Sequence, residues 1–493
     1  MRVTKKIKLF SFIIIAIVLG IIAFPIAHIL RTKWGETDIH RTLPPHYMDD
    51  ASTLNPTKVD TIIAIPKDRS AIENQLRQIL QYANAKGLKI SVAGARHSMG
   101  GHTMYPDGIV LNMLPYNHME LDTVENILTV GSGALWSDAI HYLDHYGKSI
   151  AVMQAFSSFS IGGSLSVNGH GWQKNSPPLA SSVLSFTLMN AKGQVLLCSR
   201  KENSELFHHV IGGYGLFGII LDVKLKVVNN RSLKFHYINL APENYMKYYK
   251  KYILDNPKVD LVFGRLRVSN KNFLAEATLN YFEQTVEQPI QLAQQSKKME
   301  ETKRLIFRGS VNSEYGKRLR WDLETSSAIP ARHLTFTRNE IMDSQVSLIE
   351  NKDTTSTDLL HEYFIPERNF MKFIQDIKPI LLKSKLDLLN ITIRAVNRDD
   401  DAYLNYAQED VFGFVLLFNQ KKTAQQEVEM QTLTDLLVDA TIKNEGTYYL
   451  PYRLHITKDK MRKVYPQADS FFRTKTKYDP SELFNNKFYS HYK

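Results

Sequence analysis

The sequence predicts an α+β fold in two parts, on the basis of three observations. Short apolar runs separated by glycine-rich turns fill the first half, a pattern typical of short strands with few helices. The second half joins longer apolar runs to two amphipathic helical stretches, which favours an antiparallel sheet covered on one face. An uncharged apolar stretch, residues 9–30, is long enough to cross a hydrocarbon core of about 30 Å, so an N-terminal transmembrane helix is expected.

Length, composition and charge bound the function. The chain has 493 residues, of which 43% are hydrophobic, enough for two or three domains. Its single cysteine, Cys198, excludes an internal disulfide framework and thiolate metal centres. The formal net charge of +11 is spread through the chain, so nucleic-acid binding is not expected. A basic balance suits a protein that works beside anionic lipid or handles anionic cofactors and substrates.

Residues 1–31 are predicted to be a retained membrane anchor. A cleaved signal peptide is the alternative, but the apolar stretch is longer than a usual signal core and lacks a clean cleavage site of small residues. Basic residues ahead of it favour a cytoplasmic N-terminus and an extracytoplasmic location for the rest of the chain: Arg2, Lys5, Lys6 and Lys8. Three basic residues on its other flank reduce this asymmetry. Residues 32–54 are polar, contain prolines and read as a linker.

The first folded part, residues 55–232, is predicted to begin with a strand over 59–65. Ser70 and Glu73 form a capping box for the helix that follows, which Gly87 ends. Short strands then alternate with glycine-rich turns, with one helix around residues 136–146.

The second part spans residues 233–445, and residues 446–493 are expected to return to the first. It is predicted to pair strands with two long helices, the strands over 359–365, 388–396 and 410–418 and the helices over 366–382 and 423–443.

Three glycine-rich stretches lie in the first part: AGARHSMGG, SIGGSLSVNGHG and IGGYGLFGII. The last contains a formal G-x-G-x-x-G at Gly213, Gly215 and Gly218. A dinucleotide-binding fingerprint requires a strand before the glycines, a helix after them and an acid about 20 residues on. Here SELFHHV before them looks helical, LDVKLKVV after them alternates like a strand, and no acid lies near residue 235. A Rossmann fold is therefore not predicted.

The order of these three stretches resembles the FAD-binding domain of the vanillyl-alcohol oxidase and p-cresol methylhydroxylase (PCMH-type) superfamily, nearest its alditol and aldonolactone oxidase branch. The terminal YDPSELFNNKFY resembles that family's closing segment, so the likeness covers roughly residues 55–230 and the last 45. It implies a two-part FAD-binding domain, an antiparallel substrate domain and FAD as cofactor. Backbone amides of small residues would hold the pyrophosphate.

The resemblance names the residues expected at the flavin: Gly94, Arg96, His97, Ser98, Met99, Gly100, Gly162, Gly163, Ser164, Asn168, His170, Gly215 and Ile219. A histidine at the position of His97 often bonds covalently to the flavin methyl carbon in this superfamily, and a covalent link is expected here. The alternative is a histidine that only lines the loop. His170 is expected either to contact the flavin or to hydrogen-bond backbone in its tight turn, and Asn168 is expected to have mainly a structural role.

Catalytic groups in this superfamily come from the second domain. NITIRAVNRDDDAYL resembles a stretch that carries a Glu-x-Arg pair; Arg394 matches the arginine, whereas Thr392 stands where the glutamate would be. Arg394 is expected to stabilise negative charge, with a surface arginine as the alternative. Arg453 and His455 alternate in an extended segment, and His455 suits general-base chemistry unless it is simply packed under a helix.

Together these observations predict a membrane-anchored, FAD-dependent oxidoreductase without a metal site. It would oxidise a CH–OH group of a sugar, sugar lactone, polyol or lipid-linked sugar and pass electrons to oxygen or a membrane acceptor. Oxidation of a CH–NH group is one alternative. A noncatalytic flavoprotein is another, supported by Thr392, and an NAD-linked dehydrogenase is disfavoured because the dinucleotide context fails.

Overall fold

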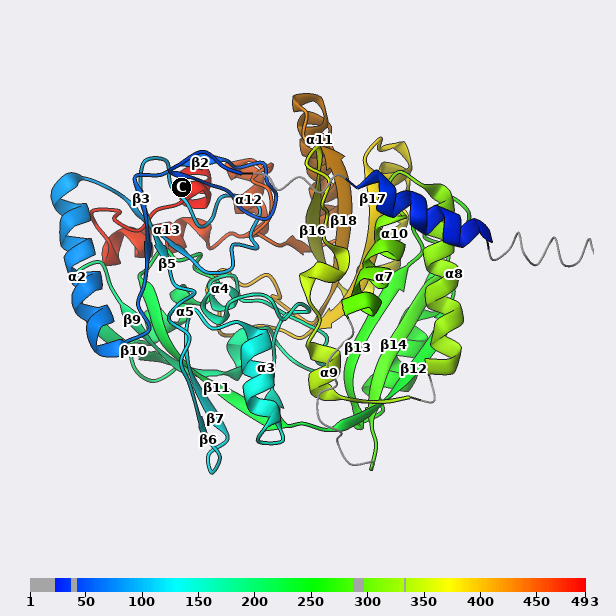
Figure 1. Ribbon diagram of the computed structural model, residues 1–493, viewed down its shortest axis with the longest axis horizontal. Helices are drawn as coiled ribbons and strands as arrows, with labels where there is room; N and C mark the ends of the chain where they lie inside the picture. The colour runs from blue at the N-terminus through cyan, green and yellow to red at the C-terminus, as the bar shows by residue number, and fades with distance from the viewer. Residues whose placement is uncertain (1–22, 37–41, 287–296, 332–333) are drawn as a thin grey trace, which may run out of the picture.

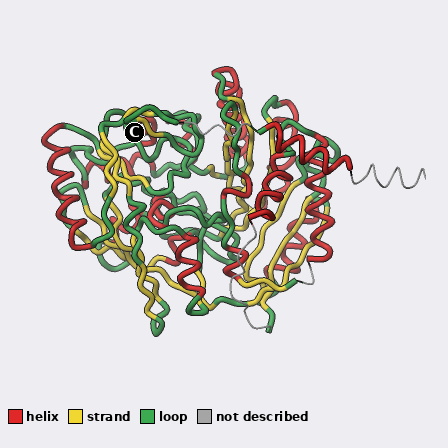
Figure 2. Tube along the Cα trace, in the orientation of Figure 1, coloured by secondary structure: helices red, strands yellow, loops and turns green. Residues whose placement is uncertain are grey.

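The computed structural model describes residues 23–36, 42–286, 297–331 and 334–493, arranged as two halves side by side (Figure 1). One half holds the short strands of the first part together with the C-terminal helices. The other is built on one large antiparallel sheet. Loops, drawn green in Figure 2, fill much of the region where the halves meet. The α+β class predicted from the sequence is confirmed.

A three-stranded parallel sheet opens the first half, in the order β3 (Thr61–Ala64), β5 (Ile109–Asn112), β4 (Ile90–Ala93). Helix α2 (Arg69–Lys86) follows β3 and packs an apolar stripe of isoleucines and leucines against this sheet. The helix ends at Gly87, whose φ of 68° lies in the left-handed region that glycine adopts without strain. Both the strand and the helix predicted here are confirmed.

A six-stranded sheet forms the second layer of this half, in the order β10-β9-β11-β7-β6 with β8 beside β11. Helix α5, predicted before the third glycine stretch, and the strand after that stretch, β11, are both present, so the order required for a dinucleotide fingerprint is absent. The strands and helices of this layer are β6 (Met119–Asp122), β7 (Ile127–Gly131), α3 (Trp136–Asp144), β8 (Lys148–Ile150), α4 (Ile161–Ser166), β9 (Val183–Met189), β10 (Val195–Ser199), α5 (Ser204–Val210) and β11 (Ile219–Asn229).

The second half is an eight-stranded antiparallel sheet in the order β15-β12-β14-β13-β17-β18-β16-β19. The strands and the two long helices expected in residues 359–443 are all present. The strands are β12 (Ser232–Leu240), β13 (Val259–Leu266), β14 (Ala277–Gln284), β15 (Thr335–Thr337), β16 (Ser356–Pro366), β17 (Asp387–Val396), β18 (Val411–Lys421) and β19 (Thr447–Tyr448).

Aromatic packing attaches helices to one face of this sheet. The ring of Tyr245, in α6 (Tyr245–Tyr249), stacks on Phe370 of α10 (Phe370–Lys383), and Phe370 lies 5.2 Å from the ring of Phe414 on β18. Helix α11 (Ala424–Lys443) buries leucines and Met430 beside α10. The opposite face is left to α7 (Lys297–Arg308), α8 (Glu314–Ala331) and the loops of the first half.

The C-terminal segment returns to the first half, as its sequence predicts. Leu483 accepts a backbone hydrogen bond from Ile90 of β4, and Asn485 donates one back to Ile90, so Phe484 extends the three-stranded sheet in parallel. The remaining short elements are β1 (Tyr47–Met48), β2 (Thr57–Lys58), α9 (Arg338–Met342), α12 (Lys458–Val464), α13 (Ala468–Tyr478) and α14 (Lys487–Tyr492).

The N-terminal part of the predicted membrane segment, residues 9–22, lies outside the described residues. Residues 23–35 are helical and contact α7 and α8: His28 Nε2 lies 2.8 Å from the carbonyl oxygen of Gly309, and the His28 ring meets Tyr315 edge-on. Glu36, next along the chain, pairs with the buried Arg304 of α7. Among the helices that the structure describes, none combines the length and apolar character needed to span a bilayer.

His102 connects the returning segment to the first half. Its Nε2–H donates to the carbonyl of Leu450 at 3.0 Å, and its ring stacks on Phe488. Burial lowers the pKa of His102 to about 3, against which the bond to Leu450 acts only partly. The folded protein therefore holds this imidazole neutral at pH values where the unfolded chain protonates it.

We expect acid to destabilise the wild-type protein relative to His102→Gln. The folded pKa lies below the unfolded one, so the free energy of unfolding falls as pH drops from 6.5 towards 3. At pH 5 this loss amounts to about 2 kcal/mol, and glutamine, which does not titrate, avoids it. Urea unfolding of both proteins at pH 7, 6 and 5 measures the difference. Parallel stability curves would contradict the linkage.

Candidate active site

A cavity of about 730 Å³ lies where the loops of the first half face the eight-stranded sheet. All three glycine-rich stretches contribute to its wall, as do β13, β16 and β17 of the sheet and helices α7 and α8. Its volume falls in the range of small-molecule and cofactor sites. The sequence-predicted site is thus brought together by segments more than 100 residues apart.

Most of the residues predicted to surround the cofactor line this cavity: Gly94, Arg96, His97, Ser98, Gly162, Gly163, Ser164, His170 and Gly215. The glycines are required by close approach. A Cβ on Gly162 would lie 2.7 Å from the Cβ of Ser132, and Gly215 has a φ of 73°. The two stretches therefore bring bare backbone to the cavity wall, as a bound diphosphate requires.

Four predicted cofactor residues do not line the cavity. Gly100 is needed for packing, because a Cβ there would lie 2.4 Å from the carbonyl oxygen of Tyr452. The buried Asn168 holds two segments, its amide nitrogen donating to Asp399 at 2.7 Å and its oxygen accepting from the Ala180 backbone, which agrees with the structural role expected for it. Met99 is buried in the core, and Ile219 is buried in β11.

His97 lies at the cavity wall in the form a nucleophile requires. Its Nε2 is 3.3 Å from the carbonyl of Ser158, so Nε2 carries the hydrogen and Nδ1 keeps a lone pair. Burial lowers the pKa of His97 to about 4; the Ser158 carbonyl opposes this shift and the Arg96 charge adds to it. The imidazole is therefore neutral at physiological pH.

Three serine hydroxyls near the glycine stretches are buried without a hydrogen-bond partner among the described residues: Ser98, Ser132 and Ser158. Buried hydroxyl groups almost always find a partner, so these positions suit a ligand rich in acceptor atoms. Ser98 and Ser132 line the cavity, and together with the bare backbone of Gly94 and Gly162 they fit the diphosphate and ring oxygens of a flavin dinucleotide.

A buried pair of polar side chains, His170 and Glu362, lies at the wall shared by the two halves. Nε2 of His170, from the loop after α4, lies 2.6 Å from Oε1 of Glu362 on β16, and their side chains are only 4% and 1% exposed. Because the carboxylate faces Nε2, it favours the hydrogen on that nitrogen. Nδ1 of His170 is buried and has no partner in the part of the chain that the structure describes.

Two further polar groups face Glu362. The Tyr452 hydroxyl donates to Glu362 Oε2 at 3.1 Å, and Arg394, as predicted, lines the cavity, with Nη1 donating to the His170 carbonyl at 3.4 Å. Burial by itself would raise the pKa of the Glu362 carboxyl, but His170, Arg394 and Tyr452 outweigh it and lower the pKa below its usual value. Glu362 is therefore ionised at neutral pH.

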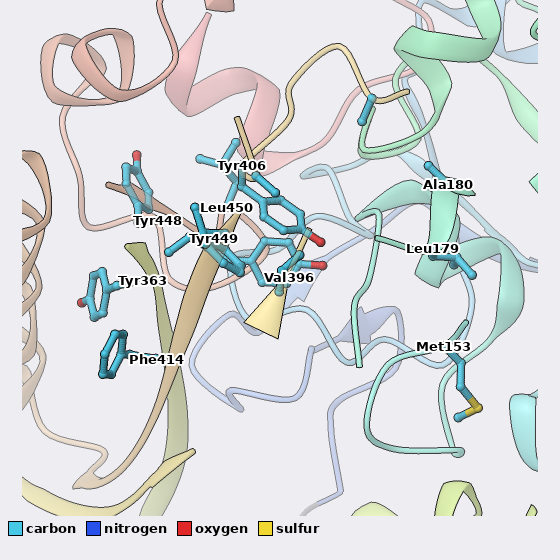
Figure 3. Close-up of a cluster of buried hydrophobic side chains, with 14 of the residues drawn as sticks. Met153, Leu179, Ala180, Tyr363, Val396, Tyr406, Phe414, Tyr448, Tyr449 and Leu450 are labelled. Carbon is cyan, nitrogen blue, oxygen red and sulfur yellow. The ribbon is translucent and has the colours of Figure 1, made fainter. Parts of the chain in front are cut away.

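Aromatic rings enclose this group of polar side chains. Figure 3 shows Tyr406 and Tyr449 side by side, with Val396 next to them. The ring of Phe364 stacks on Tyr406 at 4.2 Å, and the His170 ring lies 5.2 Å from Phe364. This apolar shell keeps the His170–Glu362 contact in a low-dielectric environment, which strengthens it.

Arg453 and His455, predicted as catalytic, do not line the cavity and are not brought to Arg394. Both bind Glu427 of α11: His455 Nε2 lies 2.9 Å from Glu427 Oε1, and Arg453 Nε lies 3.1 Å from the same oxygen. Burial would raise the pKa of Glu427, but the bonds from His455 and Arg453 lower it to about 2. The packed histidine under a helix, the alternative considered for His455, describes this position.

Sequence reasoning missed Glu362. The signal was present, because LLHEYFI places a carboxylate, next to His361, in a mostly apolar strand, and a buried charge needs a partner. The position of Glu362 also bears on Thr392, which stands where the related stretch has a glutamate. The strand registers pair Thr392 with Val415 and Val415 with Glu362, so Thr392 and Glu362 stand two strands apart in one row. The sheet thus supplies a carboxylate from β16 instead of β17.

Comparisons with known proteins agree with this geometry. Residues 68–199 match the family model described as an FAD binding domain. The chain is 33% identical over 153 residues to cytokinin dehydrogenase 2 of Arabidopsis thaliana, covering 30% of each protein. It is 30% identical over 155 residues to L-gulonolactone oxidase of Mus musculus, covering 31% of this chain and 35% of that one.

A longer and weaker match spans most of the chain. Cytokinin dehydrogenase 4 of Arabidopsis thaliana is 23% identical over 430 residues, which is 81% of this chain and 80% of the relative. The stronger matches to cytokinin dehydrogenase 2 and L-gulonolactone oxidase span only about a third of those relatives' length. The matches of highest identity are therefore local, and the match to the family model, residues 68–199, lies in the half that carries the glycine-rich stretches.

Proposed function

Because the chain belongs to the FAD-linked oxidoreductase superfamily of PCMH type, we propose that it oxidises a CH–OH group by hydride transfer to FAD. The donor would be a sugar, sugar lactone, polyol or lipid-linked sugar, and the electron acceptor oxygen or a membrane carrier. The observation that carries the proposal is the buried His170–Glu362 pair at the cavity wall.

Alcohol oxidation removes a hydride from carbon and a proton from the hydroxyl group. Bound FAD supplies the hydride acceptor. The chain supplies the proton acceptor: the Glu362 carboxylate, 2.6 Å from Nε2 of His170, favours the hydrogen on that nitrogen, and Nδ1 takes the hydroxyl proton. Arg394 stabilises the negative charge that develops on the substrate oxygen. The ionised carboxylate of Glu362 then balances the charge on the imidazolium.

We expect His170→Asn to keep its flavin but to lower the rate of anaerobic flavin reduction by roughly 10²- to 10⁴-fold, the usual contribution of a general base. Glu362→Gln should lower it by roughly 10²-fold, because the imidazole loses its orientation and its counter-charge. Stopped-flow absorbance at 450 nm, with sorbitol, galactitol and L-gulonolactone as donors, measures both.

Glu409→Gln is the matched control, since Glu409 forms an exposed ion pair with Arg368 and does not line the cavity. Normal reduction rates in both site variants would contradict the assigned roles. If neither a CH–OH donor nor a CH–NH donor bleaches the wild-type flavin, the noncatalytic alternative replaces the proposal.

A CH–NH donor is the second candidate, because two of the three relatives reported above are cytokinin dehydrogenases. The same proton acceptor would serve an amine. The two candidates differ in which donor reduces the flavin, so the assay above also includes isopentenyl adenine.

We further propose that His97 bonds covalently to the flavin through Nδ1. The neutral imidazole with Nε2–H held by Ser158 supports this step. In forming the N–C bond, the flavin methyl group and the imidazole each give up one hydrogen. The two electrons and two protons released by this bond formation would pass to the electron acceptor of the proposed reaction.

Acid precipitation of the purified yellow protein should leave flavin on the wild-type chain and release it from His97→Ala. His141→Ala, on an exposed face of α3, should retain it. Absorbance of the supernatant at 450 nm measures the released flavin. FAD released from the wild-type protein would overturn the covalent link and leave His97 as a loop contact.

We also propose that the chain is anchored in a membrane by its N-terminus, with the folded part outside the cytoplasm. Residues 9–30 contain no charged side chain, and the helix over 23–35, which overlaps the end of this stretch, exposes Phe24 and Trp34, which are 72% and 78% accessible. The contacts of His28 with Gly309 would hold α7 and α8 near the membrane surface.

The full-length protein should stay in the pellet when membranes are washed with alkaline carbonate, and a chain lacking residues 1–22 should appear in the supernatant. Proteinase K added to spheroplasts should digest the folded part. Recovery of the full-length chain in the carbonate supernatant contradicts the anchor, and protection from the protease contradicts its orientation.

A further inference from the structure

The end of the cavity away from the glycine stretches is rich in positive charge. Lys303 of α7, Arg265 of β13 and Arg320 of α8 line it, together with a single carboxylate, Glu324. Arg265 Nη2 lies 3.2 Å and Arg320 Nε 3.8 Å from the same oxygen of Glu324, which is 39% exposed. Two guanidinium groups thus share one solvated carboxylate.

Other carboxylates nearby are bound to cations outside this group. Asp387 pairs with Lys317 at 2.7 Å, and Glu276 pairs with Arg267 at 2.8 Å. Among the described residues that line this end of the cavity, the charge is therefore unbalanced in favour of cations.

The two arginines are held in place by the fold. Arg320 is buried, donates from Nη1 to the Ser310 hydroxyl at 3.2 Å and from Nη2 to the Leu389 carbonyl, and lies over the ring of Phe307. Arg265 extends from a strand, and its Nε is buried without an acceptor in the described part of the chain. An unpaired charged N–H in a cavity wall is costly unless a ligand accepts from it.

The strand registers place this group relative to the His170–Glu362 pair. Arg265 of β13 is opposite Thr392, Thr392 is opposite Val415, and Val415 is opposite Glu362. All four residues line the cavity, so they form one row across the sheet. At about 4.8 Å per strand, the backbones of Arg265 and Glu362 lie roughly 14 Å apart.

The part of the cavity wall between the two charged ends carries no charged side chain in this row. The row between Arg265 and Glu362 consists of Thr392 and Val415, neither of which is charged. The Trp172 and Phe263 rings, which stack at 4.8 Å, also line the cavity. A ligand that reaches from one end to the other must therefore present a nonionic middle section.

We propose that Arg265, with Arg320 and Lys303, binds an oxyanion carried by the substrate, a phosphate ester or a carboxylate, about three strand spacings from the group that Glu362 and His170 serve. The identification of that reacting end rests on the proposed function. A guanidinium group donates two parallel hydrogen bonds to such an oxyanion, and Arg265 has the free Nε–H for one of them. The substrate is thus an anionic molecule with an oxidisable group remote from its charge.

Binding of inorganic pyrophosphate and of D-ribose 5-phosphate to the flavin-loaded protein tests the anion site by isothermal titration calorimetry. Loaded flavin fills the glycine-lined end, so the added anion reports on the other end. Arg265→Gln and Lys303→Gln should each weaken binding, Arg265→Gln by roughly 10- to 100-fold, as expected for a charge-assisted hydrogen bond. The control Arg398→Gln, an exposed arginine paired with Asp400, should bind as the wild type does.

Anion affinity that is the same in Arg265→Gln and Arg398→Gln would overturn the proposal, as would the absence of binding at millimolar concentration. Binding that also requires Lys303 but tolerates Arg265→Gln would overturn the role given to Arg265. The anion could belong to a lipid-linked phosphate or to a soluble phosphate ester. Titration of a farnesyl phosphoryl ribose in parallel distinguishes these two sources. Tighter, Arg265-dependent binding of that compound assigns a lipid-linked phosphate, and equal affinity assigns a soluble one.

Flavin reduction of the wild-type protein by neutral polyols is scored separately. If no polyol bleaches the flavin while pyrophosphate binding depends on Arg265, the CH–OH proposal fails and the anion site stands. If a polyol bleaches the flavin while anion binding is insensitive to Arg265→Gln, the anion site fails and the CH–OH proposal stands.

Discussion

The buried pair of His170 and Glu362 is the interaction on which the arrangement of the cavity depends. An ionised carboxylate in an apolar sheet is stable only beside a compensating group, and removal of one partner of a buried pair typically costs about 3–5 kcal/mol. Glu362 comes from the eight-stranded sheet and His170 from a glycine-rich loop of the other half. The pair therefore ties the docking of the two halves to the chemistry at their boundary.

The C-terminal segment reinforces this docking from the other side of the pair. After β19 the chain supplies Tyr449 and Tyr452 to the cavity wall, with Tyr452 bonded to Glu362. It then crosses to the first half, where Phe484 joins the sheet beside Ile90. One segment thus positions a hydroxyl at the site and anchors itself in the core of the opposite half. Because both ends of the segment are fixed, Tyr449 and Tyr452 have little freedom to move away from the His170–Glu362 pair.

Charge is distributed unevenly along the cavity wall. Near the flavin motifs the wall combines bare backbone and serine hydroxyls with Arg96 and His97. At Glu362 a carboxylate is balanced by His170 and Arg394, and at the far end arginines outnumber carboxylates. Each region suits a different part of a ligand: a diphosphate, a reacting hydroxyl and an oxyanion. Position 392 has a threonine where the related stretch has a glutamate. This is consistent with the three regions, because the row across the sheet places the carboxylate of Glu362 beside His170.

The sequence by itself determined the local elements and the cofactor-facing loops. Period-2 and period-3.6 apolar patterns located strand β3 and helices α2, α10 and α11, and the glycines near His97 and Gly162 marked places where backbone must approach a ligand. These features depend on neighbours within a few residues, so they are readable from the chain order. Residues 9–30 carried a membrane prediction for the same reason, although most of that stretch lies outside the described residues.

Only the tertiary structure decided which catalytic candidates meet. Arg453 and His455 have the right chemistry and spacing, yet α11 places Glu427 against them and away from the cavity. Glu362 and Arg265 have no local signature of a shared site, because their relation is set by pairing of β13, β17, β18 and β16. Strand register joins residues almost 100 positions apart in the chain. Sequence periodicity gives the face of each strand but not its partner, and the partner decides the site.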